Sequence, residues 1–150
     1  MELTTGDIIT PREIKYSYNC IFQDKKIPIM SYTLETIIAE KFQTIISRGV
    51  LNTRLKDFYD IYILMNTKIE EINLETLILA IRNTFNKRET KYDISEFNSI
   101  LDDLKESNDL KRLWIVYQSK NNYSKNINYM MAIESIESII KILEEELVTM

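Results

Sequence analysis

The stretch TLETIIAEKFQTIISRGVLNTRLKDFYDIYILM, residues Thr33–Met65, has the pattern of two helices joined by a tight turn. Its first half carries one apolar stripe at helical spacing, made of Leu34, Ile37, Ile38, Phe42, Ile45 and Ile46. Lys41 falls inside that stripe. In the second half, Asp60 lies among apolar and aromatic residues, and Asp57 comes just before them. Because a buried charge is costly unless it is paired, the stretch predicts a helix pair whose charges are paired or used in function.

Spacing alone leaves two interpretations of these charges open. Lys41 could cover apolar surface with its aliphatic stem while its ammonium stays in water. Asp57 could pair with Arg54 one turn earlier, and Asp60 could pair with Lys56 at the i, i+4 spacing. Alternatively, Lys41 faces one or both aspartates across the helix pair and binds an anionic phosphate as a point charge.

The remaining chain reads as a series of helices, since only two glycines and two prolines occur in 150 residues. The predicted helices cover about residues 33–48, 52–66, 73–85, 93–105, 109–121 and 127–147. Their predicted N-caps are Thr33, Asn52 or Thr53, Asn73, Asp93, and Asn108 or Asp109, and Gly49 is suited to end the first helix.

The leading residues favour strands instead. Residues 14–22 alternate apolar and polar side chains, and residues 27–32 form a second apolar run after a polar turn. The predicted fold class is therefore α+β but mostly helical: a short N-terminal β hairpin followed by a bundle of five or six helices. We expect a β-rich part at residues 1–32 and a helical part at residues 33–150.

Composition excludes several classes of protein. A net charge of -4 argues against a strongly basic nucleic-acid scaffold. A single cysteine, Cys20, rules out an internal disulfide framework, and the absence of a signal-peptide pattern favours the cytoplasm. No apolar run approaches the roughly 20 residues that span a bilayer. With no histidine in the chain, Ser-His-Asp and Cys-His catalysis and imidazole zinc sites are excluded.

Two further segments are rich in charged residues. Residues 109–125 mix basic and aromatic side chains, which can track a nucleic-acid backbone and stack on bases. A core face of Leu110, Leu113, Trp114 and Tyr117 with solvated lysines is the favoured interpretation. The run Glu144-Glu145-Glu146 is expected to be a solvated helix end without chemistry.

Two blocks of the sequence form recognisable motifs: E-x-I-x-A-E-K, here Glu35, Ile37, Ala39, Glu40 and Lys41, and T-R-x-K-D-F-Y-D, here Thr53–Asp60. Both blocks resemble motifs of the AbiEii family of nucleotidyltransferase toxins. The resemblance covers about residues 4–64, with TTGDIITP at its start. It implies a DNA polymerase β-like nucleotidyltransferase fold, of which residues 1–32 would be part of the sheet, followed by a helical part.

The resemblance also implies a chemistry and roles for residues. The family transfers a nucleoside monophosphate from a nucleoside triphosphate (NTP) to an acceptor, which is tRNA in some relatives, with Mg²⁺ as the expected metal. Lys41 takes the role of the lysine that holds the triphosphate. Asp57 is the first choice, with Asp60 close behind, for the aspartate that orients or activates the acceptor or anchors the lysine. The candidate catalytic residues are thus Lys41, Asp57 and Asp60, and the candidate nucleotide-binding residues are Lys41 and Arg54.

One departure from the family pattern limits the prediction. The family's metal-binding Gly-Ser loop and Asp-x-Asp pair precede this region, and the 150 residues contain neither. We therefore expect a C-terminal part of such an enzyme, without transfer activity on its own and without metal ligands among these residues. The alternative is a non-catalytic helical module that binds RNA or a partner protein such as an antitoxin. No membrane partner is expected.

Overall fold

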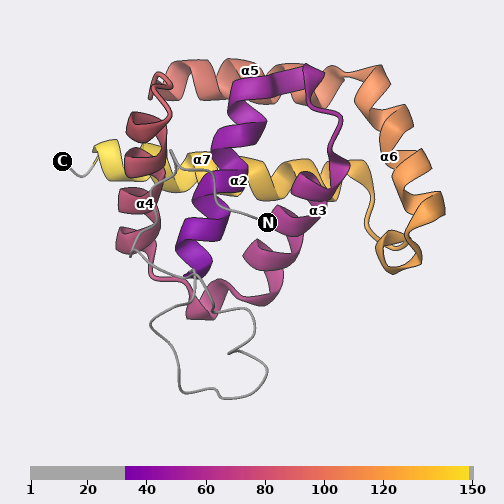
Figure 1. The fold of residues 1–150 in the computed structure, drawn as a ribbon, viewed down its shortest axis with the longest axis horizontal. Coiled ribbons are helices and arrows are strands. Elements are labelled where there is room, and N and C mark those ends of the chain that lie inside the picture. Colours follow the sequence, from indigo (N-terminus) through magenta and orange to yellow (C-terminus); the bar gives the residue numbers. More distant parts are fainter. Residues whose placement is uncertain (1–32, 149–150) are drawn as a thin grey trace.

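The computed structural model describes residues 33–148, and this part consists of six α-helices (Figure 1). They are α2 (Leu34–Arg48), α3 (Leu55–Thr67), α4 (Leu74–Lys87), α5 (Ile94–Glu106), α6 (Asn108–Lys120) and α7 (Tyr129–Val148). Short 3-10 turns lie between them: η2 (Gly49–Leu51), η3 (Ile69–Glu71) and η4 (Asn122–Ser124). The prediction of a mostly helical chain is confirmed, whereas the predicted strands of residues 1–32 lie outside the described residues. Within the described part, no helix is long and apolar enough to cross a membrane.

Side-chain caps begin several of these helices where the sequence predicts them. Thr33 accepts a hydrogen bond from the backbone N–H of Thr36, and Asn73 accepts one from Thr76. Asp93 accepts from the backbone N–H groups of Ser95 and Glu96. Each cap satisfies a donor that the first helical turn leaves without an intrahelical partner.

Three predicted helix starts are wrong by one or two residues. The N-cap of α3 is Arg54, because Asn52 uses its Oδ1 to accept the Arg54 N–H in a turn before the helix. The N-cap of α6 is Ser107, which alone separates α5 from α6 and accepts the Leu110 N–H. Helix α7 begins at Tyr129 rather than at Ile127, whose carbonyl accepts a hydrogen bond from the Trp114 indole.

The helices are arranged around α2, which crosses the middle of the molecule in Figure 1. Helix α2 packs against α4 and α3, and the long helix α7 packs against α3 and α5. The Phe42 side chain of α2 is fully buried, with its ring centroid 5.9 Å from that of Phe85 and 5.5 Å from that of Phe97. Burial of such aromatic side chains contributes several kcal/mol to the stability of a small core. Packing of these rings therefore fixes α2 through faces of the helix other than the one that carries Lys41.

The acidic run near the end of α7 is not the freely solvated end that the sequence suggested. The Glu146 carboxylate lies 2.8 Å from the Arg82 guanidinium of α4. The Glu144 carboxylate accepts a hydrogen bond of 2.7 Å from the Asn98 amide of α5. That prediction is therefore wrong for Glu144 and Glu146, because the end of α7 lies close enough to α4 and α5 for polar contacts.

Candidate functional site

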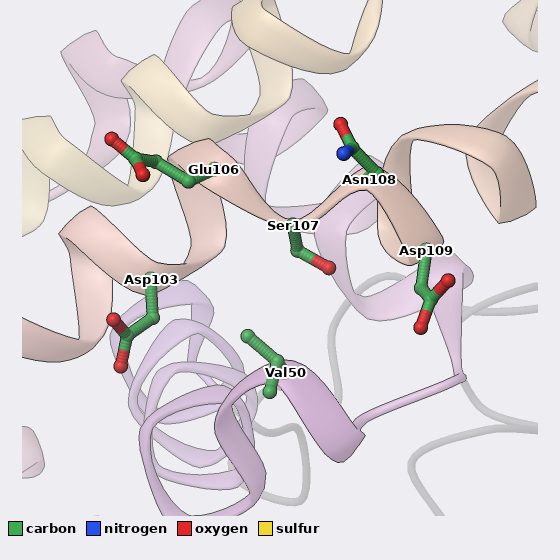
Figure 2. Close-up of a pocket in the computed structure, with 6 residues that line it drawn as sticks. All are labelled: Val50, Asp103, Glu106, Ser107, Asn108 and Asp109. Carbon is green, nitrogen blue, oxygen red and sulfur yellow. The ribbon is translucent and has the colours of Figure 1, made fainter.

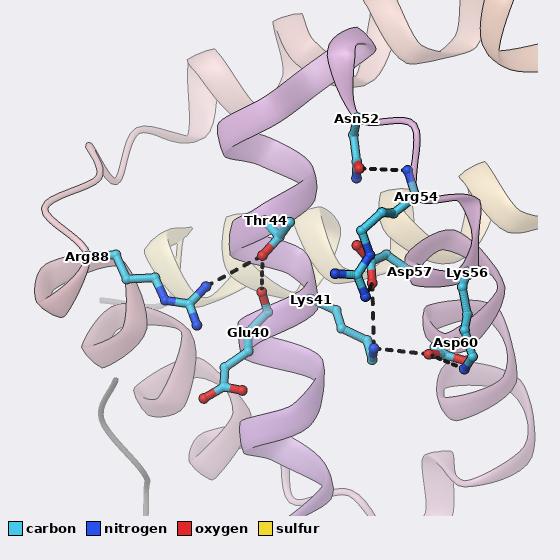
Figure 3. Close-up of polar contacts among 9 residues, drawn as sticks. All are labelled: Glu40, Lys41, Thr44, Asn52, Arg54, Lys56, Asp57, Asp60 and Arg88. Carbon is cyan, nitrogen blue, oxygen red and sulfur yellow. Dashed lines mark hydrogen bonds and ion pairs between the residues drawn. The ribbon is translucent and has the colours of Figure 1, made fainter. Parts of the chain in front are cut away.

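Lys41 lies in the middle of α2 and extends towards α3, where two aspartates meet it (Figure 3). Its Nζ is 3.0 Å from Asp60 Oδ2 and 3.6 Å from Asp57 Oδ1. The predicted approach of lysine and aspartate across the helix pair is therefore confirmed, and Lys41 contacts both carboxylates.

The local pairs that spacing allowed are also present. Lys56 Nζ lies 2.9 Å from Asp60 Oδ1, and Arg54 Nη2 lies 3.7 Å from Asp57 Oδ1. The ion pairs of both interpretations therefore coexist: each aspartate pairs with Lys41 of α2 and with a neighbour at or near the start of α3. We call Lys41, Arg54, Lys56, Asp57 and Asp60 the charge cluster.

The two carboxylates of the charge cluster differ in environment. The Asp57 side chain is 5% exposed and the Asp60 side chain is 18% exposed. Desolvation of a carboxylate is costly unless nearby cations and donors offset it. Asp57 is therefore the carboxylate whose position depends more strongly on Lys41 and Arg54.

The cations of the charge cluster reach solvent. The Lys41 side chain is 24% exposed, while Arg54 and Lys56 are 63% and 59% exposed. The stem of Lys41 is thus mostly covered while part of the side chain is open to water, which is the geometry of a snorkelling lysine. Three cations accompany two carboxylates, so the cluster keeps one positive charge in excess and can accept an anion at its surface.

Asn52 holds the start of α3 in place beneath the charge cluster. It is fully buried, and its Oδ1 accepts the backbone N–H of Arg54 at 3.0 Å. Its Nδ2 has no hydrogen-bond partner among the residues that the structure describes. The sequence predicts Asn52 only as a helix cap; the tendency of asparagine to hydrogen-bond the backbone two residues later is the signal that could have indicated its positioning role.

A second polar group lies on another side of α2. Arg88 Nη1 donates to Gln43 Oε1 at 2.7 Å, and Gln43 Nε2 donates to Thr90 Oγ1 at 2.8 Å. Figure 3 shows the Glu40 carboxylate directed away from the Lys41 ammonium. Glu40 and Lys41, although consecutive in sequence, therefore face different sides of α2.

A cavity of about 400 Å³ lies away from the charge cluster, at the junction of α5, α6 and η2 (Figure 2). It is lined by Val50, Asp103, Glu106, Ser107, Asn108 and Asp109. Three carboxylates would repel a triphosphate, so this cavity does not suit a nucleotide.

The described residues do not fit a magnesium site. Among residues 33–148, no three His, Cys, Asp or Glu side chains lie together in a way that could hold a metal ion. In the charge cluster, lysine and arginine already occupy the approach to both carboxylates. The charges of the cluster therefore suit an anion better than a divalent cation.

A family comparison identifies the chain. The family model described as "Nucleotidyl transferase AbiEii toxin, Type IV TA system" matches residues 1–134. The chain belongs to the AbiEii family. The match includes all five residues of the charge cluster, which confirms the family that the motifs indicate. Neither the curated proteins nor the solved structures include a significant match.

Proposed function

We propose that the charge cluster is the phosphate-binding part of a nucleotidyltransferase site, which transfers a nucleoside monophosphate from an NTP to an acceptor. The observation that carries this proposal is the contact of a partly exposed Lys41 with Asp60 at 3.0 Å, beside two further exposed cations. Membership in a nucleotidyltransferase toxin family supports it.

In this proposal Lys41 and Arg54 bind the triphosphate. When the acceptor oxygen attacks the α-phosphorus, negative charge grows on the departing pyrophosphate, and a fixed ammonium stabilises that charge. A lysine held by carboxylates on a neighbouring helix loses less freedom on binding than a free surface lysine. The roles are therefore binding and electrostatic stabilisation of the leaving group.

The two aspartates act as positioning residues. Asp57, the more buried carboxylate, anchors Lys41 and Arg54 from below. Asp60 holds Lys41 from the side of Lys56 and is the carboxylate closer to solvent. Because both carboxylates face cations, we assign neither to proton abstraction. The family's Mg²⁺ chemistry depends on an Asp-x-Asp pair absent from these 150 residues, so no step is assigned to a metal here.

The test is calorimetric titration of the protein with inorganic tripolyphosphate and with NTPs. Lys41→Ala should lose most of the tripolyphosphate and NTP binding. The control is Lys68→Ala, which removes an exposed lysine at the end of α3 outside the charge cluster; this variant should bind as the unmodified protein does. Equal binding by Lys41→Ala and the unmodified protein would refute the assignment.

A transfer assay tests the expected need for the missing motifs. We propose that residues 1–150 alone do not transfer a nucleotide from a labelled NTP to RNA in the presence of Mg²⁺, because they lack the Gly-Ser loop and the Asp-x-Asp pair. Metal-dependent transfer by these residues alone would contradict this proposal.

A second candidate function is binding of a protein partner such as an antitoxin. An apolar surface on α6 and the start of α7 favours it, since Ile115, Val116 and Met130 are 64%, 42% and 40% exposed. The family is one of toxins in toxin–antitoxin systems, so an antitoxin is the expected counterpart. Ile115→Glu should then abolish co-purification with the antitoxin while leaving tripolyphosphate binding unchanged; retained co-purification would refute this surface.

A further inference from the structure

Three tyrosines from separate segments meet at the surface beside the charge cluster. Tyr59 comes from α3, Tyr117 from α6 and Tyr123 from η4. The ring centroids of Tyr59 and Tyr123 are 4.9 Å apart, and each lies 6.3 Å from that of Tyr117. The Tyr117 and Tyr123 hydroxyls are hydrogen-bonded at 2.8 Å. We call these three residues the tyrosine surface.

Buried and hydrogen-bonded residues of α6 and the following loop hold the tyrosine surface in place. The Tyr117 ring stacks on the Trp114 ring with centroids 5.3 Å apart, and the Trp114 indole is anchored by its hydrogen bond to the Ile127 carbonyl. Gln118 donates to the same carbonyl at 2.8 Å and to the carbonyl of buried Ser124 at 3.2 Å, which holds the loop that carries Tyr123. Ordering these rings therefore adds little entropic cost to binding.

One ring remains open to a ligand. Tyr123 is 54% exposed, whereas Trp114 beneath the surface is 1% exposed. Aromatic rings in this arrangement offer a π-face on which a planar group can stack.

The tyrosine surface adjoins the charge cluster. Tyr59 immediately precedes Asp60 on α3, and Lys56 lies one turn earlier on the same helix. Burial is the main cause that raises the pKa of Tyr59 and of Tyr117, and the Asp60 carboxylate is among the charges that raise both further. The Tyr59 and Tyr117 hydroxyls thus lie within electrostatic range of Asp60, which contacts Lys41.

Charges around the rings favour an anionic ligand. Lys120 and Lys125 are exposed on either side of Tyr123 in the chain, and Lys56 is 59% exposed on α3. Aromatic rings flanked by lysines suit a ligand made of bases and phosphates better than they suit an apolar protein. An apolar protein would instead be expected on the exposed aliphatic residues of α6 and α7.

We propose that the exposed ring of Tyr123, held in place by Tyr59 and Tyr117, stacks on an unpaired base of single-stranded RNA, so that the RNA strand leads to the charge cluster. The stacking site follows from the ring geometry, and the identification of this RNA as the acceptor rests on the function proposed above. Stacking reads any base through its π-face, so the site tolerates different sequences.

The test uses fluorescence anisotropy with a short, labelled single-stranded RNA and the same RNA annealed to its complement. The unmodified protein should bind the single strand more tightly than the duplex. Tyr123→Ala should weaken single-strand binding by about tenfold, the typical effect of one stacked base. Tyr123→Phe keeps the ring and should stay within about threefold of the unmodified protein. Ile115→Ala, an exposed change on α6, the helix that carries Tyr117, should have no effect.

Salt dependence and tripolyphosphate binding distinguish stacking from other causes. Tyr123→Ala should leave unchanged the slope of log affinity against log salt, whereas Lys56→Ala should reduce it by about one contact. Tyr123→Ala should also bind tripolyphosphate normally. No single-strand binding by the unmodified protein, or full binding by Tyr123→Ala, would overturn this proposal while leaving the nucleotide site intact. If Tyr123→Ala also lost tripolyphosphate binding, the substitution would be acting through a general structural change, and the stacking proposal would be overturned. If the unmodified protein fails to bind tripolyphosphate but Tyr123→Ala still loses RNA, the proposed nucleotide function fails and the stacking site stands.

Discussion

The contacts of Lys41 with two carboxylates allow a sharp test of whether distance or burial governs the charge cluster. The perturbation is a pair of double-mutant cycles, one from Lys41→Met and Asp57→Asn, the other from Lys41→Met and Asp60→Asn. Each cycle isolates the coupling energy of one ion pair from the other effects of each substitution.

Distance alone slightly favours the pair with Asp60. At an effective dielectric constant of about 20, charges 3.0 Å and 3.6 Å apart attract each other by roughly 5.5 and 4.6 kcal/mol, respectively, before desolvation is subtracted. Asp60 keeps Lys56 at 2.9 Å when Lys41 is removed, and water reaches its side chain. Asp57 is 5% exposed and keeps only the longer contact of 3.7 Å with Arg54 among the ion pairs of the described residues.

Burial therefore predicts the order of the couplings. We expect about 1–2 kcal/mol for Lys41 with Asp57, below the cost of breaking a fully buried pair because Lys41 is partly solvated. For Lys41 with Asp60 we expect about 0.5 kcal/mol, in the range of exposed pairs.

Urea unfolding of the unmodified protein, the three single variants and the two double variants measures both couplings. High salt should reduce the Asp60 coupling more than the Asp57 coupling, because screening acts mainly on exposed charges. A larger coupling for Asp60 than for Asp57 would refute the reasoning, since the shorter distance would then outweigh burial.

Three further perturbations test the scaffold that holds the site. Phe42→Ala should lower the free energy of unfolding by about 3–5 kcal/mol, because it leaves a cavity between α2 and its neighbours; a loss below about 1 kcal/mol in urea unfolding would contradict the central position of this ring. Glu35→Ala should cost about 1–3 kcal/mol by removing the buried carboxylate that accepts the Asn73 N–H at 2.6 Å, and Glu35→Gln should retain most of the stability. Hydrogen bonds from the backbone N–H of Glu96 and, to a smaller extent, from that of Ser95 lower the pKa of Asp93. The ionised Asp93 carboxylate therefore stabilises the folded state at a pH above the pKa that it has in the unfolded chain, and this contribution is lost as the pH falls below about 4. Asp93→Asn should unfold with a weaker dependence on pH in that acid range, and an unchanged acid dependence would argue against the cap.

The helical part of the fold was largely predictable because local signals agree with the tertiary structure. Thr33, Asn73 and Asp93 are caps that the structure retains, and apolar stripes coincide with buried faces. Two of the three wrong helix starts fall where a residue near the start makes another contact. Asn52 is committed to a turn, and the Ile127 carbonyl is committed to Trp114. Such long-range or turn contacts compete with helix capping and leave no periodic trace in the sequence.

The charge cluster was predictable as a set of residues but not in its arrangement. Helical spacing identified Lys41 as a charge in an apolar stripe and paired the aspartates with their neighbours on α3. It could not decide that both kinds of pair coexist, because that depends on how closely α2 and α3 pack. The tyrosine surface was predictable only in part. The stretch 109–125, which holds Tyr117 and Tyr123, shows the mixture of basic and aromatic residues in the sequence, but Tyr59 is distant in sequence and only the fold joins it to them.

Helix α3 explains how one short motif can serve four purposes. Successive residues of a helix point about 100° apart, so Asp57, Phe58 and Tyr59 face different neighbours, whereas Asp60 returns to the side of Asp57 and shares Lys41 with it. Asp57 meets Lys41 and Arg54, while Phe58 is fully buried, with its ring 6.4 Å from that of Tyr129 on α7. Tyr59 meets Tyr123, and Asp60 meets Lys41 and Lys56.

This division predicts separable defects within one helical turn. Phe58→Ala should lower stability by about 3–5 kcal/mol, and Tyr59→Ala should weaken RNA binding with a small loss of stability. Asp57→Asn should weaken tripolyphosphate binding more than Asp60→Asn does, because it removes the anchor shared by Lys41 and Arg54. Unfolding, RNA titration and calorimetry on the same four variants would measure this. If all four variants lost every property in parallel, the motif would act as a single structural unit, and the assignment of separate roles to its side chains would be wrong.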